Sequence, residues 1–144
     1  MRITANGRYA LRATLALAKM AKDGKAVSIS TLAQAENISA AFLEKIFFKL
    51  KKAGIVKSER GPGGGFSFTR PADSLSLYEI MEAAGEEMTV LPCDRSVCEC
   101  GRQGQCEAHK VIVSVTDTIN SYLQGITLKM VLDGKEFQQT HHSA

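Results

Sequence analysis

The fold of this chain is decided by residues 39–69, which read SAAFLEKIFFKLKKAGIVKSERGPGGGFSFT. The first part predicts a helix over residues 40–53, because apolar side chains recur at helical spacing and form one buried stripe of Leu43, Ile46, Phe47 and Leu50. A second face of this helix is basic and carries Lys45, Lys49 and Lys52. Both stripes are typical of the recognition helix of a helix-turn-helix, although an ordinary amphipathic surface helix carries the same pattern.

The second part of the stretch predicts a β-hairpin. Two short strands are expected at residues 55–58 and 66–69, and the turn between them reads RGPGGG, which favours tight turns. A hairpin directly after a recognition helix is the wing of a winged helix, which weakens the surface-helix alternative. Backbone at Gly61 can approach phosphate closely, and Arg60 can pair with phosphate or enter the minor groove. No Gly-Lys-Ser/Thr follows, which argues against a nucleotide-binding loop.

The residues before this stretch complete the predicted DNA-binding unit. A helix, a short strand and a second helix are expected in this order, at residues 7–22, 27–29 and 31–36. Asp23-Gly24 ends the first helix, and Ser28 or Ser30 caps the second. Ser39 is the expected N-cap of the recognition helix. We therefore assign residues 1–71 to a winged helix-turn-helix domain.

Charge divides the chain into two unlike halves. Residues 1–70 carry thirteen Lys or Arg against four Asp or Glu, a net charge of +9, whereas residues 71–144 carry five against eleven, a net charge of −6. A basic half is typical of a nucleic-acid surface, although a solvated lysine surface gives the same count. The sequence shows no membrane-length apolar run, no signal-peptide core and no enzyme motif. We expect a cytoplasmic protein that is not an enzyme, has no small-molecule substrate and binds no membrane.

The acidic half predicts helices around a cysteine loop. A short helix is expected over residues 74–84, and residues 107–128 predict a long helix with one apolar stripe of Ile112, Val115, Ile119, Tyr122, Leu123 and Ile126. Its β-branched residues leave a strand over residues 111–115 open. The stripe needs a partner, either the first helix of the same chain or a second copy.

The whole pattern predicts a mainly α fold with a small β-hairpin, a winged helix-turn-helix plus a long C-terminal dimerisation helix. After the DNA-binding domain we expect a short helix with the cysteine loop at residues 72–106. A dimerisation region is expected at residues 107–133 and a disordered tail at residues 134–144.

All four cysteines lie close together, and His109 follows them. They are Cys93, Cys98, Cys100 and Cys106. Thiolates that converge bind soft metals or form disulfides, and reduced cytoplasmic thiols favour a metal site or a redox sensor over a structural disulfide. Zinc fits less well, because the segment has no Cys-x₂-Cys knuckle. A metal or redox site beside a DNA-binding domain suggests a regulated transcription factor.

Four short motifs occur in order along the chain. They are MRIT at residues 1–4, GRYA at 7–10, AGIV at 53–56 and, most specific of all, RGPGGGF at 60–66. With the spacing Cys100-x₅-Cys106-x₂-His109, they resemble the iron–sulfur cluster regulator (IscR-type) family of bacterial transcription factors, over the chain from Met1 to about Leu132. The resemblance implies a homodimeric winged helix-turn-helix protein that binds a duplex DNA operator and holds an iron–sulfur cluster.

Carried over by position, the resemblance implies three cysteine ligands and a weaker fourth ligand, namely Cys93, Cys100, Cys106 and His109. It also implies that Glu44 senses whether the cluster is present. Together with the basic stripe and the wing, it places the expected DNA contacts at Ser39, Ala41, Phe42, Lys45, Lys49, Arg60 and Gly61.

The chain departs from the family pattern in its cysteine spacing. Six residues separate Cys93 from Cys100, one more than usual, and Cys98 is an extra thiol that could replace Cys93 or His109 as a ligand. We expect a 2Fe–2S cluster rather than a 4Fe–4S cluster, with the ligand role of Cys98 open. The alternatives are a thiol/disulfide redox-sensing regulator without a cluster, and a small metal or redox carrier protein.

Overall fold

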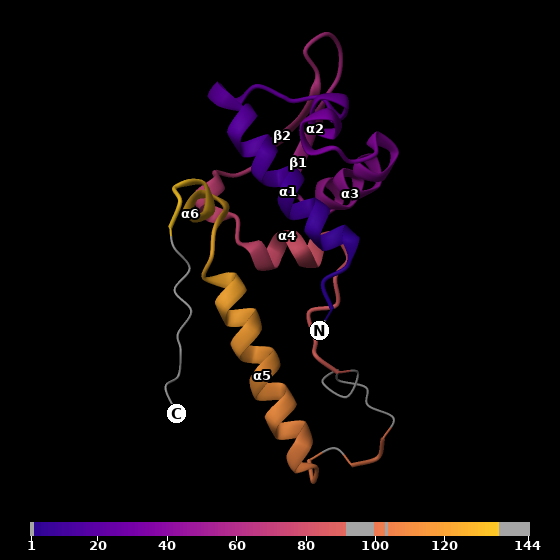
Figure 1. Cartoon of the computed structure of the whole chain (residues 1–144), viewed down its shortest axis with the longest axis vertical. Helices are drawn as coiled ribbons and strands as arrows, with labels where there is room; N and C mark the ends of the chain where they lie inside the picture. The colour runs from indigo at the N-terminus through magenta and orange to yellow at the C-terminus, as the bar shows by residue number, and fades with distance from the viewer. Residues whose placement is uncertain (1, 92–99, 103, 136–144) are drawn as a thin grey trace.

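The computed structural model describes residues 2–91, 100–102 and 104–135 (Figure 1). Its mainly α fold with one small β-hairpin confirms the predicted class. The N-terminal lobe contains three α-helices and a short 3₁₀ turn, namely α1 Ala5–Met20, η1 Lys22–Gly24, α2 Ile29–Glu36 and α3 Ala40–Lys52.

Local side chains set the ends of the two helices of the helix-turn-helix. The Ser28 Oγ accepts a hydrogen bond from the Thr31 N–H at 3.2 Å, and the Ser39 Oγ accepts one from the Phe42 N–H at 3.4 Å, as the two predicted N-caps require. Asn37 ends α2 in the left-handed conformation, with φ of 52°. The turn between α2 and α3 is therefore encoded by its own residues.

The hairpin consists of β1 Val56–Glu59 and β2 Gly65–Phe68, which pair antiparallel. Val56 lies opposite Phe68, and Glu59 lies opposite Gly65. Each strand starts and ends within one residue of its predicted position, so the predicted hairpin is confirmed.

One backbone bridge joins the hairpin to the helices. Val27 and Phe66 exchange two hydrogen bonds, with N···O distances of 2.9 and 2.8 Å. The predicted strand over residues 27–29 is wrong beyond this bridge, because Ser28 caps α2. Gly65 is needed here, since a Cβ on it would lie 2.2 Å from the carbonyl oxygen of Val27.

The core of the lobe fixes α3 against the hairpin. The predicted apolar stripe of α3 is buried, with at most 1% of the surface exposed at Leu43, Ile46, Phe47 and Leu50. The ring of Phe47 lies edge-on against that of Phe66, with centroids 5.0 Å apart. Full burial of one such side chain stabilises the fold by roughly 1.5–3 kcal/mol, so the recognition helix and the wing are held as one unit.

The second half of the chain adds η2 Ala72–Ser74, α4 Leu77–Ala83, α5 Glu107–Gln124 and α6 Leu128–Leu132. The helix predicted over residues 74–84 begins only at Leu77, because Ser76 and Glu79 form a capping box that fixes its start. The long helix ends at Gln124 instead of residue 128, and the strand alternative over residues 111–115 is wrong.

The chain returns to the N-terminal lobe after α5. The Leu77 N–H donates to Ile126 O at 2.9 Å, and the Leu128 N–H donates to Leu75 O at 3.0 Å, so α6 packs beside η2 and α1. Helix α5, in contrast, extends away from the lobe and packs mainly against α4 (Figure 1). No helix in the described part of the chain is long and apolar enough to cross a membrane.

Candidate functional site

The outer face of α3 presents most of the residues predicted to contact DNA. The predicted contacts that are exposed on it, or at its N-cap, are Ser39, Ala41, Lys45 and Lys49. Glu44, which is expected to sense the cluster, and Lys52 of the basic stripe are exposed on α3 as well. Phe42 is half-buried, because its ring lies edge-on against Tyr9 of α1 with centroids 5.4 Å apart. An exposed helix face with lysines is what a recognition helix needs to lie in the major groove.

Lys49 is held differently from the other lysines of α3. Its Nζ donates a hydrogen bond to the carbonyl oxygen of Ala84, at 3.1 Å, where α4 ends. A cation at this end of a helix is favourable, because the last carbonyl groups lack partners within the helix. Lys49 therefore ties α3 to the residues that follow α4, and its predicted contact with DNA stays a prediction.

The hairpin turn exposes Arg60 and Gly61, the two wing residues predicted to contact DNA. The Gly64 N–H donates to Gly61 O at 2.9 Å and closes the turn. Figure 1 shows this turn reaching beyond the rest of the lobe. A guanidinium group at this point can reach a phosphate or the minor groove.

Residues 84–91 lead from α4 toward the cysteines, and we call them the connecting segment. Glu86 in this segment is buried, with 8% of its surface exposed. Its carboxylate accepts hydrogen bonds from the backbone N–H of Gly7 at 2.7 Å, from that of Thr4 at 3.1 Å and from the Thr4 hydroxyl. Glu86 thus supplies the negative acceptor that the N-terminus of α1 requires.

The electrostatics of Glu86 follow from these contacts. Burial alone would raise the pKa of Glu86, but the hydrogen bonds from Thr4 and Gly7 and the charge of Lys49 outweigh it and hold the pKa below its ordinary value. The carboxylate is therefore ionised at neutral pH. Space is also restricted, since a Cβ on Gly7 would come within 2.7 Å of the Glu86 side chain.

Helix α5 holds the connecting segment at its other end. The Asn120 Nδ2 donates to Met88 O at 2.9 Å, and the Val90 N–H donates to the Thr116 Oγ1 at 3.3 Å. The segment is thus fixed to α3, α1 and α5 just before the cysteines begin. Local sequence patterns could not reveal these contacts, because they join residues far apart in the chain.

The structure places only part of the predicted metal site. Cys93 and Cys98 lie outside the described residues, Cys100 is exposed and Cys106 is half-buried. Cys106 is the N-cap of α5, and the half-buried His109 follows within the first turn. No three His, Cys, Asp or Glu side chains gather as a metal site within the ranges that the structure describes.

The predicted apolar stripe of α5 divides into two faces. Ile112, Ile119 and Leu123 are half-buried, and Ile126 is buried after the end of the helix. Val115 and Tyr122 face solvent in the single chain, with exposures of 40 and 54%. Val111, which the predicted stripe did not include, lies on the same face and is 62% exposed.

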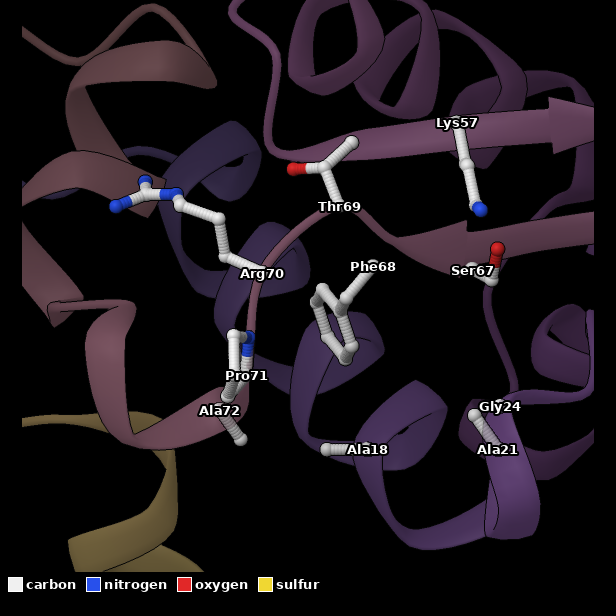
Figure 2. A pocket seen from close by; sticks show the side chains of 10 residues that line it. All are labelled: Ala18, Ala21, Gly24, Lys57, Ser67, Phe68, Thr69, Arg70, Pro71 and Ala72. Atoms are coloured by element: carbon white, nitrogen blue, oxygen red, sulfur yellow. The ribbon is translucent and has the colours of Figure 1, made fainter.

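A cavity of about 440 Å³ lies at the base of the hairpin (Figure 2). The ring of Phe68 stands at its centre, α1 contributes Ala18, and Ala21 follows at the C-cap of α1. Arg70 on its rim is paired with Glu79, with an N···O distance of 2.8 Å. Sequence reasoning missed this cavity, because its lining residues come from separate segments.

Comparison with known proteins shows similarity along nearly the whole chain. The family model Rrf2, described as an iron-dependent transcriptional regulator, matches residues 3–134. A provisionally named HTH-type transcriptional regulator of Neisseria meningitidis is 38% identical over 135 residues, which are 94% of this chain and 90% of that protein. The HTH-type transcriptional regulator IscR of Aliivibrio salmonicida is 34% identical over 140 residues, 96% of this chain and 82% of that one.

Solved structures show the same fold. T. potens IscR matches with a TM-score of 0.74 and 26% identity, over 96% of this chain and 92% of that one. The oxidized form of Staphylococcus aureus CymR matches with a TM-score of 0.70 and 27% identity, over 97% of this chain and 100% of that one. The winged-helix architecture expected from the sequence is thereby confirmed.

Proposed function

Since the chain belongs to the Rrf2 family of iron-dependent transcriptional regulators, we propose that it is a dimeric, operator-binding regulator whose DNA affinity depends on an iron–sulfur cluster. Membership confirms the resemblance inferred from the motifs, and the named relatives are transcriptional regulators rather than enzymes. DNA binding follows from the family. The dimer, the cluster, its ligands and the cytoplasmic location are the parts that we propose.

The connecting segment is the observation that carries this proposal. At its start, Ala84 accepts the hydrogen bond from Lys49 of the recognition helix. At its end, Val90 is bonded to α5, and Cys93 follows three residues later. A change in the position of the cysteine segment would therefore be transmitted to α3 through these contacts. Such a change would alter how α3 presents its outer face to DNA.

The donor set fits an iron–sulfur cluster. Cys106 is the N-cap residue of the 18-residue helix α5, so this end of the helix fixes where its thiol lies. His109 lies three residues later, on the same side of the helix, and can offer an imidazole nitrogen. With Cys93 and Cys100 these residues would supply three thiolates and one imidazole to the 2Fe–2S cluster that we propose. A bound cluster would supply iron–thiolate bonds, which oxidants, nitric oxide or iron shortage break.

Cysteine-to-alanine variants prepared without oxygen test the ligand set. We expect Cys93→Ala, Cys100→Ala and Cys106→Ala to lose iron, sulfide and visible absorbance. Cys98→Ala is expected to keep all three, because Cys98 does not match a ligand position of the family. Loss of iron in Cys98→Ala with retention in Cys93→Ala would move the first ligand to Cys98. Wild-type protein without iron or sulfide would exclude the cluster.

A thiol/disulfide switch is the second candidate, and two observations favour it. Cys100 is exposed, and a CymR relative has been crystallised in an oxidized form. This function requires no metal. It predicts that oxidant changes operator affinity in iron-free protein and that a thiol reductant restores it, whereas the cluster proposal predicts that iron-free protein does not respond.

Replacement of the wing arginine should weaken operator binding. Arg60→Ala removes the guanidinium at the tip of the hairpin, and we expect a loss of about 1–3 kcal/mol in binding free energy, measured by fluorescence anisotropy. Lys129→Ala, which removes an exposed cation on α6, serves as the control and should leave affinity nearly unchanged. Equal affinity of Arg60→Ala and wild type would show that the hairpin does not contact DNA.

A further inference from the structure

One aromatic ring on the outer face of α3 takes no part in the core. Phe48 exposes 66% of its surface, while its neighbour Phe47 is fully buried. A single exposed apolar side chain is common on proteins and proves nothing alone. The surroundings of Phe48 decide what it can bind.

Phe48 lies in an open hollow of about 700 Å³ on the outer face of the helix. The hollow is lined by Ala41, Glu44, Lys45, Phe48, Lys49 and Lys52. Lysine side chains have apolar stems and charged tips, so they wall such a hollow with methylene groups and place ammonium groups at its rim. The ligand that fits this hollow is a small apolar group on a molecule with many negative charges.

Duplex DNA has this chemistry in its major groove. The C5 methyl group of thymine projects into the groove between two rows of phosphates, and phenylalanine is one of the side chains that contact it. Phe48 follows Lys45 by three residues and Ala41 by seven, so the three residues share one face of α3. The net charge of +9 over residues 1–70 favours DNA over an uncharged protein surface as the occupant.

We propose that Phe48 reads the methyl group of one thymine in each half-site of the operator, an inference that rests on the proposed DNA-binding function. Burial of the methyl group against the ring makes a thymine preferred at this position. Lys45 and Lys52 beside it bind phosphates and carry no base preference, whereas the ammonium group of Lys49 is bonded to Ala84. Phe48 is thus a specificity residue that the basic pattern of α3 does not reveal.

Removal of single methyl groups tests this assignment. The probe is a duplex selected by the anaerobically purified full-length protein from a random 30-bp library. Each thymine in turn is replaced by deoxyuridine, which lacks only the C5 methyl group. Wild type should lose about fourfold in affinity at one thymine per half-site, the equivalent of ~0.8 kcal/mol for one buried carbon.

Two variants separate the ring from the charges around it. Phe48→Ala should bind more weakly and lose the difference between thymine and deoxyuridine at that position. Lys52→Ala is the matched control, which should bind more weakly to every duplex but keep the difference. Thermal unfolding of Phe48→Ala should match wild type, because the ring is exposed.

The outcomes distinguish this inference from the function on which it rests. If no duplex is selected, the proposed operator-binding function fails and the role of Phe48 falls with it. If a duplex is selected but no thymine is sensitive, or Phe48→Ala keeps the sensitivity, only the reading of thymine by Phe48 is overturned. An affinity loss in Phe48→Ala that is equal for all duplexes would place the ring against the sugar–phosphate backbone and overturn the reading of thymine.

Discussion

Val115→Glu is expected to convert the protein into a monomer and to abolish tight operator binding. Val115 lies between Val111 and Tyr122 on the exposed apolar face of α5, and 40% of its surface is accessible in the single chain. An uncompensated buried charge costs about 3–5 kcal/mol, and the twofold axis of the proposed dimer would place it in the interface twice. Dimerisation should therefore weaken by roughly 10⁴-fold or more.

Sedimentation velocity and operator titration on the same sample check this result. Ser121→Glu is the control, because it adds the same charge to an exposed position outside the apolar face. Ile119→Glu is a poorer test, because Ile119 is already half-buried within its own chain and a charge there would also disturb folding. An intact Val115→Glu dimer would show that two copies meet elsewhere.

Glu86→Ala is expected to lower the free energy of unfolding by about 3 kcal/mol, because it leaves the N–H groups of Thr4 and Gly7 without an acceptor. Glu86→Gln keeps one oxygen acceptor and should lose less. Urea denaturation measures both, with Asp117→Ala on the exposed surface of α5 as a control that should change stability by less than about 0.5 kcal/mol. A Glu86→Ala protein as stable as the control would mean that Glu86 does not hold α1.

The same carboxylate gives stability a defined pH dependence. The pKa of Glu86 lies below its ordinary value of 4.5 in the folded protein. Its contribution is therefore complete above that value and is lost as the pH falls through the lower folded pKa. Glu86→Gln should be less stable than wild type at neutral pH, and the difference should shrink in acid. A constant difference between pH 7 and pH 3 would contradict this assignment.

Features encoded by neighbouring residues could be predicted from the sequence. The caps at Ser28 and Ser39, the buried stripe of α3 and the glycine-rich hairpin all depend on residues within a few positions of one another. The class of fold and the exposed wing followed from them. The motifs then identified the family, because a turn with so many glycines is specific.

Features encoded by distant residues could not be predicted. Glu86 caps a helix that lies 79 residues earlier at Gly7, and no local pattern marks it as an acceptor. Lys49 belongs to the basic stripe in the sequence, yet its ammonium group bonds to Ala84, 35 residues later. The apolar stripe of α5 was visible as a whole, but its division into a covered and an exposed face depends on where the connecting segment lies.

The hydrogen bond from Val90 to Thr116 has a consequence for metal uptake. It spans 26 positions of the chain, and all four cysteines lie between its ends. Closing a loop of this length costs about 3 kcal/mol of chain entropy, and the contact between Val90 and Thr116 closes it without using a cysteine. For the proposed cluster, loading and unloading would then be local exchange reactions within a folded chain. Cluster-free and cluster-loaded forms of the proposed regulator would then compete for promoters as two lasting species, and a lost cluster could be replaced without refolding the chain.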